Sequence, residues 1–187
     1  MISSDEMDTS EILTKGKTFA EERNIKDIVV ASTSGTTGLK AAKLFEGSNV
    51  NLVVVAHSTG FRAPNEQEFS EENLQHIKEL GGRVFVGPMI FHNINSAIGE
   101  QTGFSALNLV ADVLRLFGQG TKVALECVLM ACDAGLIDAG KEVISVAGTG
   151  RGADTALLIR SSNSKDLFNA RIREVLLKPS KPENLPL

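Results

Sequence analysis

The sequence predicts an α/β fold, a three-layer sandwich with a mostly parallel sheet and an antiparallel edge strand. Two fully apolar strands, at residues 27–33 and 51–57, are joined by a helical segment at 36–46. A crossover helix of this kind implies parallel pairing with a right-handed connection. Strands at 142–147 and 155–161 are separated by a linker too short for such a crossover, so these two should run antiparallel.

The length of the chain favours one domain. Its 187 residues can bury a sizeable core, so we expect a single domain at 1–187, with a core at about residues 8–178 and a loose, proline-containing tail at 179–187. The alternation of strands and helices predicts helices on both faces of the sheet.

Two of the expected helices carry clear boundary signals. The helix at 8–23 begins with Asp8 as a capping residue and has Glu11 three positions on, which is the pattern of a capping box. Another helix begins at Ser70 and ends at Gly81, because serine is a favoured N-cap and glycine a favoured C-cap.

The second half of the chain continues the alternation. Its expected elements are a strand at 83–87, an irregular segment rich in Asn and Ser at 92–102, an amphipathic helix at 105–117, a nearly all-apolar, buried helix at 123–134, and strands at 142–147, 155–161 and 170–178. The helix at 105–117 is inferred from apolar residues spaced three, four and three apart, which share one helical face. Gly118 and Gly120 separate it from the helix that follows.

Composition and charge exclude several classes of function. The net charge of -4 and the pI near 5.4, with no run of basic residues, argue against a nucleic-acid-binding protein. The N-terminal segment is polar and acidic, unlike a secretory signal. The longest apolar stretch, at 123–137, is too short to span a membrane, so we expect a cytoplasmic protein without membrane partners. Glu126 and Asp133 interrupt this stretch and are expected at the solvent edge of their helix.

The sequence offers no metal site and no evident catalytic set. Cys127 and Cys132 lie in one predicted helix and point about 140° apart, so we expect buried free thiols in a reducing compartment. The histidines are scattered, and no Ser–His–Asp spacing or carboxylate pair shares a loop. There is no Walker loop, and the glycine-rich segment at 148–152 precedes a strand, unlike a dinucleotide fingerprint.

The most informative segment follows the first apolar strand and leads into a helix. Its candidate ligand-binding residues are Ser32, Thr33, Ser34, Gly35, Thr36 and Thr37. The hydroxyls can donate hydrogen bonds, the glycines let the backbone approach a ligand, and the helix start presents free amides and the positive end of the helix dipole. These features predict an anion pocket, most often one for phosphate. The alternative is that one hydroxyl simply caps the helix.

Further candidate residues follow other strands at the same edge of the sheet. In open parallel sheets, ligands bind outside the carboxyl ends of the strands, so the loops at 57–61, 87–92 and 148–154 should lie beside the hydroxyl loop. The candidates that these loops add are His57, Gly148, Thr149, Gly150, Arg151 and Gly152. Arg151 can clamp a phosphate through two N–H groups. The alternatives are a flexible hairpin at 148–152 and a packed, hydrogen-bonded His57.

Two segments of the chain resemble the carboxyl-terminal domain of pyruvate kinases. Residues 28–45 and 51–56 match a strand that leads into a Ser/Thr–Gly–Ser/Thr loop, a helix and a second apolar strand. Residues 135–160 resemble the last strand, glycine-rich loop and antiparallel strand of that domain. In pyruvate kinases the two loops form the site of a phosphorylated allosteric effector. The resemblance implies that residues 32–37 hold a phosphate here and that residues 150–152 close over the ligand.

The resemblance also bears on activity and ligand. The catalytic (β/α)₈ barrel of pyruvate kinases needs about 250 residues and does not fit in this chain, which therefore is not expected to be a pyruvate kinase. The chain resembles stand-alone proteins similar to this domain, found in archaea and bacteria, whose members look able to hold flavin mononucleotide (FMN). For FMN, the ribityl phosphate would suit the hydroxyl loop and the flat ring would lie near Phe61, Met89 or Phe104.

Three classes of function remain open at this point. The first is a binding or regulatory module for a phosphorylated small molecule, with FMN as the candidate cofactor and no metal. The second is an enzyme that acts on a phosphorylated substrate or uses bound flavin, with His57 or His92 as acid or base. The third is a structural subunit of a larger assembly, which rests on the apolar helix at 123–134. A homo-oligomer is compatible with all three.

Overall fold

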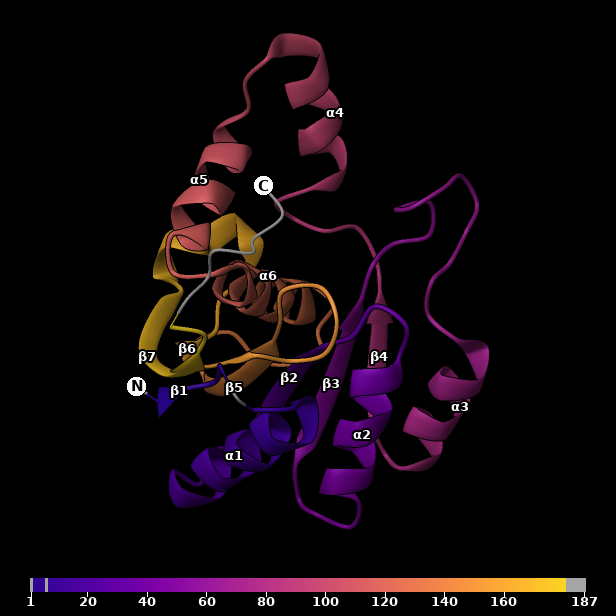
Figure 1. The fold of residues 1–187 in the computed structure, drawn as a ribbon, viewed down its shortest axis with the longest axis vertical. Coiled ribbons are helices and arrows are strands. Elements are labelled where there is room, and N and C mark those ends of the chain that lie inside the picture. The colour runs from indigo at the N-terminus through magenta and orange to yellow at the C-terminus, as the bar shows by residue number, and fades with distance from the viewer. Residues whose placement is uncertain (1, 6, 181–187) are drawn as a thin grey trace.

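The computed structural model describes residues 2–5 and 7–180, which form a seven-stranded sheet with helices on both faces (Figure 1). The strands are β1 (Ile2–Ser3), β2 (Asp27–Ala31), β3 (Asn51–Ala56), β4 (Arg83–Val86), β5 (Glu142–Ala147), β6 (Thr155–Arg160) and β7 (Arg171–Lys178). The helices are α1 (Thr9–Glu22), α2 (Thr36–Phe45), α3 (Glu71–Glu79), α4 (Asn93–Thr102), α5 (Ala106–Arg115), α6 (Gln119–Asp133) and the short 3₁₀ helix η1 (Ser164–Asn169). The α/β class and the order of nearly all elements agree with the sequence prediction. The tail at 181–187 lies outside the described residues.

The strand order is β1-β7-β6-β5-β2-β3-β4. Strands β5, β2, β3 and β4 are parallel neighbours, as the crossover helices predicted. Strand β6 pairs antiparallel with β5, as its short linker required, but the expectation of an antiparallel edge strand is wrong. Strand β7 pairs with the other side of β6, and β1 pairs with β7, so both ends of the described chain extend the sheet beyond β6.

Two hydrophobic cores lie on the two faces of the sheet. On one face α1, α2 and α3 pack against the strands through residues such as Ile12, Ala42 and Ile77. On the other face α6 lies across the strands, with α5 against it, and Val128 and Leu129 of α6 are fully buried. Because α6 is buried within its own domain, its apolar sequence no longer supports a structural subunit.

Helix α4 occupies a segment that the sequence predicted to be irregular. Asparagine and serine have low helix propensity, which explains the error, but long-range contacts override it here. Asn95 is buried, and its side-chain amide donates to Asn108 of α5 at 2.5 Å. Helix α6 also begins four residues earlier than expected. Gly118 precedes it with a φ of 109°. Gly120 lies in the first turn of the helix, where a larger residue is excluded because its Cβ would strike Thr155 of β6.

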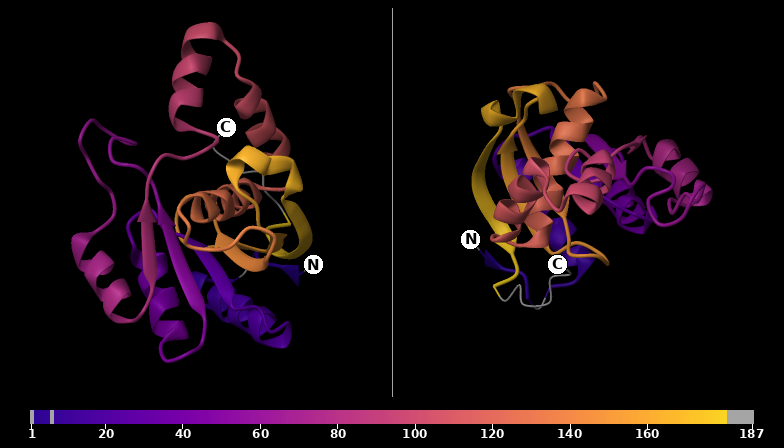
Figure 2. Two further views of the ribbon diagram at one scale, coloured as in Figure 1. Left: turned by 180° about the vertical axis from the view of Figure 1, so that it is seen from behind. Right: turned by 90° about the horizontal axis from the view of Figure 1, so that it is seen from above.

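Helices α4 and α5 form an arm that extends away from the sheet, as Figures 1 and 2 show. The arm exposes an apolar surface that comprises Ile94, Ile98, Phe104, Leu109, Val113, Leu116 and Phe117. Exposed apolar surface of this extent is typical of an interface, and the homo-oligomer stays a prediction. None of the helices in the described residues is long and apolar enough to cross a membrane.

Candidate functional site

A cavity of about 800 Å³ opens at the carboxyl ends of β2, β3 and β5. The loops after these strands and after β4 all contribute to its lining, as the sheet topology predicted. Of the candidate phosphate- and cofactor-binding residues at 32–37, 57 and 148–152, all except Gly35 and Thr149 line it. Asn93 holds two of the loops together, because its side chain donates to Ser58 Oγ at 2.9 Å and accepts from the Met89 amide at 2.7 Å.

The hydroxyl loop partly caps α2 with its own side chains. Ser32 Oγ accepts a hydrogen bond from the Gly38 amide at 3.1 Å, and Ser34 Oγ lies 3.5 Å from the Thr36 amide. The capping alternative therefore holds for these two serines. The Thr37 amide, between them in the first turn, has no acceptor in the part of the chain that the structure describes. The loop thus leaves one donor of the helix start for a ligand.

Gly35 shapes the loop from behind the cavity. It has a φ of 89°, and a Cβ on it would lie 2.7 Å from Cβ of Asn73 in α3. Glycine is therefore required at this position both by backbone conformation and by close packing. The structure gives Gly35 a positioning role instead of a place in the cavity wall.

The glycine-rich segment at 148–152 is a hairpin connection that also lines the cavity. The Asp154 amide donates to the Ala147 carbonyl at 2.9 Å and closes the hairpin. The Ala153 amide donates to Thr9 Oγ1 at 3.1 Å, which ties the loop to the start of α1. Arg151 is exposed and lines the cavity. The loop is therefore a hairpin connection and at the same time part of the cavity wall, so the two interpretations do not exclude each other.

Basic side chains outnumber acidic ones around the cavity. The basic residues in its lining are Lys40, Arg62, Arg115, Lys122 and Arg151, and the acidic ones are Glu68 and Glu126. Arg62 lies 3.7 Å from Glu68, Lys122 lies 2.5 Å from Glu126, and Arg115 pairs with Asp112 at 2.6 Å. Within the described ranges, 2–5 and 7–180, Lys40 and Arg151 have no such ion pair. The lining of the cavity therefore carries an excess of positive charge, which attracts anions.

Three tilted rings, those of His57, Phe61 and His92, form a cluster in the lining of the cavity. The Phe61 ring centroid lies 4.3 Å from that of His57 and 5.1 Å from that of His92. His57 Nδ1 is 3.2 Å from Glu68 Oε2, so His57 is hydrogen-bonded, as one alternative had it, and still lines the cavity. Burial lowers the pKa of His92, and the Lys122 charge lowers it further, so His92 is neutral at pH 7.

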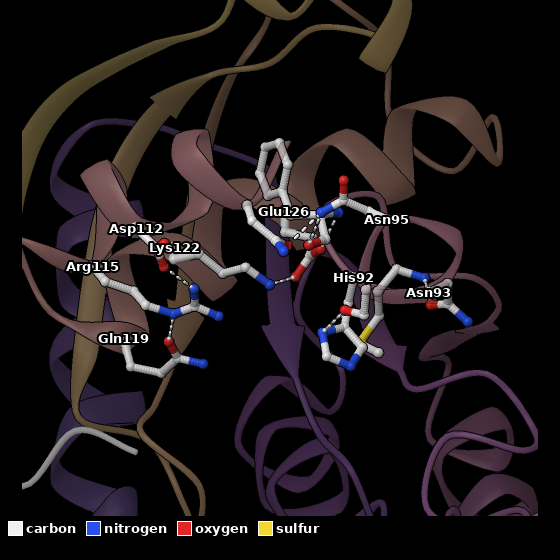
Figure 3. Close-up of polar contacts among 12 residues, drawn as sticks. His92, Asn93, Asn95, Asp112, Arg115, Gln119, Lys122 and Glu126 are labelled. Atoms are coloured by element: carbon white, nitrogen blue, oxygen red, sulfur yellow. Dashed lines mark hydrogen bonds and ion pairs between the residues drawn. The ribbon is translucent and has the colours of Figure 1, made fainter. Parts of the chain in front are cut away.

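A further wall of the cavity was not predicted from the sequence. It consists of Arg115 from the end of α5 and Gln119, Lys122 and Glu126 from α6 (Figure 3). The expectation that Glu126 sits at the solvent edge is wrong, because α6 lies between the sheet and α5 and Glu126 is 3% exposed. Asp133 is exposed, as expected. A Lys–Glu pair spaced i, i+4 inside an apolar helix was the signal that could have identified this wall.

The remaining candidate residues divide between the cavity and other sites. Phe61 and Met89 line the cavity, whereas Phe104 is in the arm, 64% exposed and outside the lining, so its predicted place near a ligand ring is wrong. Cys127 and Cys132 are buried free thiols, as predicted. Burial raises the pKa of Cys127 and raises that of Cys132 to about 11, so both are unreactive thiols near neutral pH. No group of metal ligands is found among the described residues.

The architecture defines an α/β domain with a ligand-sized cavity at the carboxyl edge of its parallel strands. The chain belongs to the pyruvate kinase α/β domain family, whose sequence model matches residues 11–159.

Solved structures of larger proteins resemble parts of the chain. Cryptosporidium parvum pyruvate kinase is 16% identical over 74% of this chain and 20% of its own, with a TM-score of 0.38. An O-ureido-L-serine synthase is 18% identical over 67% of this chain and 48% of its own, with a TM-score of 0.34. The chain thus spans about a fifth of the one protein and about half of the other.

Proposed function

We propose that this protein binds a phosphorylated small molecule in the cavity at the carboxyl edge of the sheet. The observation that carries the proposal is that one cavity is lined by Thr37, whose amide has no acceptor among the described residues, and by Lys40 and Arg151, which have no ion pair there. A helix start and two basic groups without ion pairs in the described residues are a favourable environment for a phosphate dianion. The hydroxyls of Thr33 and Thr36 add donors there.

FMN is the candidate ligand. The cavity volume of about 800 Å³ is within the usual range for small-molecule sites, about 300–1,000 Å³. Ala31, Val55 and Met130 provide an apolar surface for a flat ring, and the Phe61 ring provides an aromatic one. The residues present therefore fit a flavin with its phosphate at the hydroxyl loop. When bound, a flavin supplies hydride and one-electron transfer chemistry.

Absorption spectroscopy and calorimetry test whether the protein binds a phosphorylated molecule and whether FMN is that molecule. We expect purified protein to show flavin absorption bands, or to gain them and bind with a measurable heat when FMN is added. Ribitol 5-phosphate, which is FMN without its ring, should also bind, because it carries the phosphate that the loop recognises. Binding of ribitol 5-phosphate without binding of FMN would exclude FMN as the ligand but keep the phosphate site. Binding of neither compound would exclude the phosphate site.

A second candidate function is catalysis with the histidines of the ring cluster. The hydrogen bond between His57 and Glu68 at 3.2 Å is the arrangement that orients an imidazole for proton transfer. His92 is neutral at pH 7 because its pKa is lowered, so it is able to act as a base there. Both side chains line the cavity.

The histidine mechanism predicts a loss of turnover that binding does not share. With any phosphorylated substrate found to turn over, His57→Ala and His92→Ala should each lower kcat by about 100-fold or more, since general acid–base catalysis contributes factors of that size. Because the His92 pKa is lowered, activity that uses neutral His92 should persist below pH 6.5 before it falls. Turnover at the wild-type rate in both variants, measured at saturating substrate, would eliminate this mechanism.

A further inference from the structure

Lys122 and Glu126 form a buried ion pair in the wall of the cavity. Their side chains are 5% and 4% exposed, and Lys122 Nζ lies 2.5 Å from Glu126 Oε2. A buried ion pair is expensive to desolvate and often adds little to stability compared with apolar residues of the same volume. Its position in a cavity wall, and not in the closed core, suggests a role in binding.

The hydrogen bonds of the pair are asymmetric (Figure 3). Glu126 uses both carboxylate oxygens, one for Lys122 and the other for the Phe91 amide at 2.6 Å. An ammonium group has three N–H donors, and Lys122 gives one of them to Glu126. Among the described residues no other acceptor contacts Lys122 Nζ, which otherwise faces the Phe91 ring at 5.8 Å. Lys122 therefore has donor capacity left in a buried position at the cavity.

The ion pair and the hydroxyl loop approach the cavity from opposite faces of the sheet. The loop begins α2, which packs in one core, whereas Lys122 and Glu126 belong to α6, which packs in the other. Arg115 and Gln119 flank Lys122 in the wall and hydrogen-bond each other at 2.8 Å. The apolar residues Val123, Cys127 and Met130 continue the same face of α6. The cavity thus has polar groups on both sides of an apolar floor.

We infer that the ligand has two polar ends, with its phosphate at the hydroxyl loop and an oxygen acceptor of carbonyl type at Lys122. This inference rests on the proposed function and extends it to the chemical class of the ligand. Glu126 balances the charge of Lys122, so the subsite suits a neutral carbonyl oxygen better than a second phosphate. The ring carbonyls of a flavin are acceptors of this class, whereas ribitol 5-phosphate has no carbonyl.

The double variant Lys122→Met/Glu126→Gln tests the inference. Methionine keeps the apolar stem, and glutamine keeps an acceptor for the Phe91 amide, so no charge is left buried and the fold should persist. We expect FMN to bind the variant about tenfold to a hundredfold more weakly, because it loses a hydrogen bond from a charged donor. Ribitol 5-phosphate should bind the variant and the wild type equally, since it contacts only the other end.

The control variant is Lys78→Met, which makes the same lysine-to-methionine change at an exposed position of α3, outside the cavity lining. It should bind both compounds as the wild type does. Equal FMN affinity in the double variant and the wild type would overturn the inference and leave the phosphate site intact. Binding of ribitol 5-phosphate without binding of FMN to the wild type would also overturn it. If neither compound binds the wild type, the proposed function itself fails.

Discussion

Thr36→Asp is expected to abolish phosphate binding without harming the fold. Thr36 is the first residue of α2, is exposed, and lines the cavity beside the Thr37 amide. A carboxylate at a helix start interacts favourably with the helix dipole, by about 0.3–1 kcal/mol, so the folded state should be as stable as before or slightly more stable. The same carboxylate would occupy the region of the anion and repel it. We expect the affinity for ribitol 5-phosphate and FMN to fall at least about 100-fold.

Opposite changes in stability and affinity separate a ligand site from a merely structural cap. Calorimetric titration measures the affinity, and thermal unfolding measures the stability. Asn49→Asp introduces the same charge change at an exposed position outside the cavity lining and should leave binding unaltered. Undiminished affinity in Thr36→Asp would show that the anion does not bind at the start of α2.

Lys122→Met alone is expected to destabilise the protein by about 3–5 kcal/mol, because it leaves the carboxylate of Glu126 buried without its partner. The Phe91 amide still donates to that carboxylate, but one neutral hydrogen bond does not replace an ammonium group. Adding Glu126→Gln should restore most of the lost stability, since the buried charge is then gone. Urea denaturation of the wild type, both single variants and the double variant gives the coupling energy directly.

Two results would contradict this account of the ion pair. If Lys122→Met lowered the free energy of unfolding by less than about 1 kcal/mol, Glu126 would not be left as a buried, unpaired charge by the loss of its partner. If Glu126→Gln changed the free energy of unfolding of Lys122→Met by the same amount as that of the wild type, the two side chains would act independently. The cycle is independent of any ligand, so it tests the geometry of the wall even if the ligand is not FMN.

The sequence predicted the parts of the molecule that are encoded locally. Strands β2 and β3 are runs of buried aliphatic residues, mostly valine, and the hydroxyl loop between β2 and α2 is continuous in sequence. The capping box of α1 was identified from Asp8 and Glu11 and is present, with Asp8 accepting from the Ser10 and Glu11 amides. One side of the candidate site was therefore predictable from the order of residues alone.

The other side of the site depends on contacts between distant segments. Glu126 was assigned to a solvent edge because a charged residue in a helix is usually exposed, and only the packing of α6 between the sheet and α5 shows otherwise. Phe104 was predicted to lie near the ligand ring, and no local signal shows that α4 and α5 form an arm that carries it away from the sheet. Strand β6 was placed at an edge because the pairing of β7 with its other side has no local signal.

The arrangement of two cores around one cavity has a consequence for motion. Helix α2 belongs to one layer of the sandwich and α6 to the other, and both contribute groups to the cavity. A ligand that contacted both Thr37 and Lys122 would link the two helical layers at the end of the sheet. Ligand binding would then slow the local opening of both helices. Hydrogen exchange of the α2 amides would therefore depend on the contact that the ligand makes with α6.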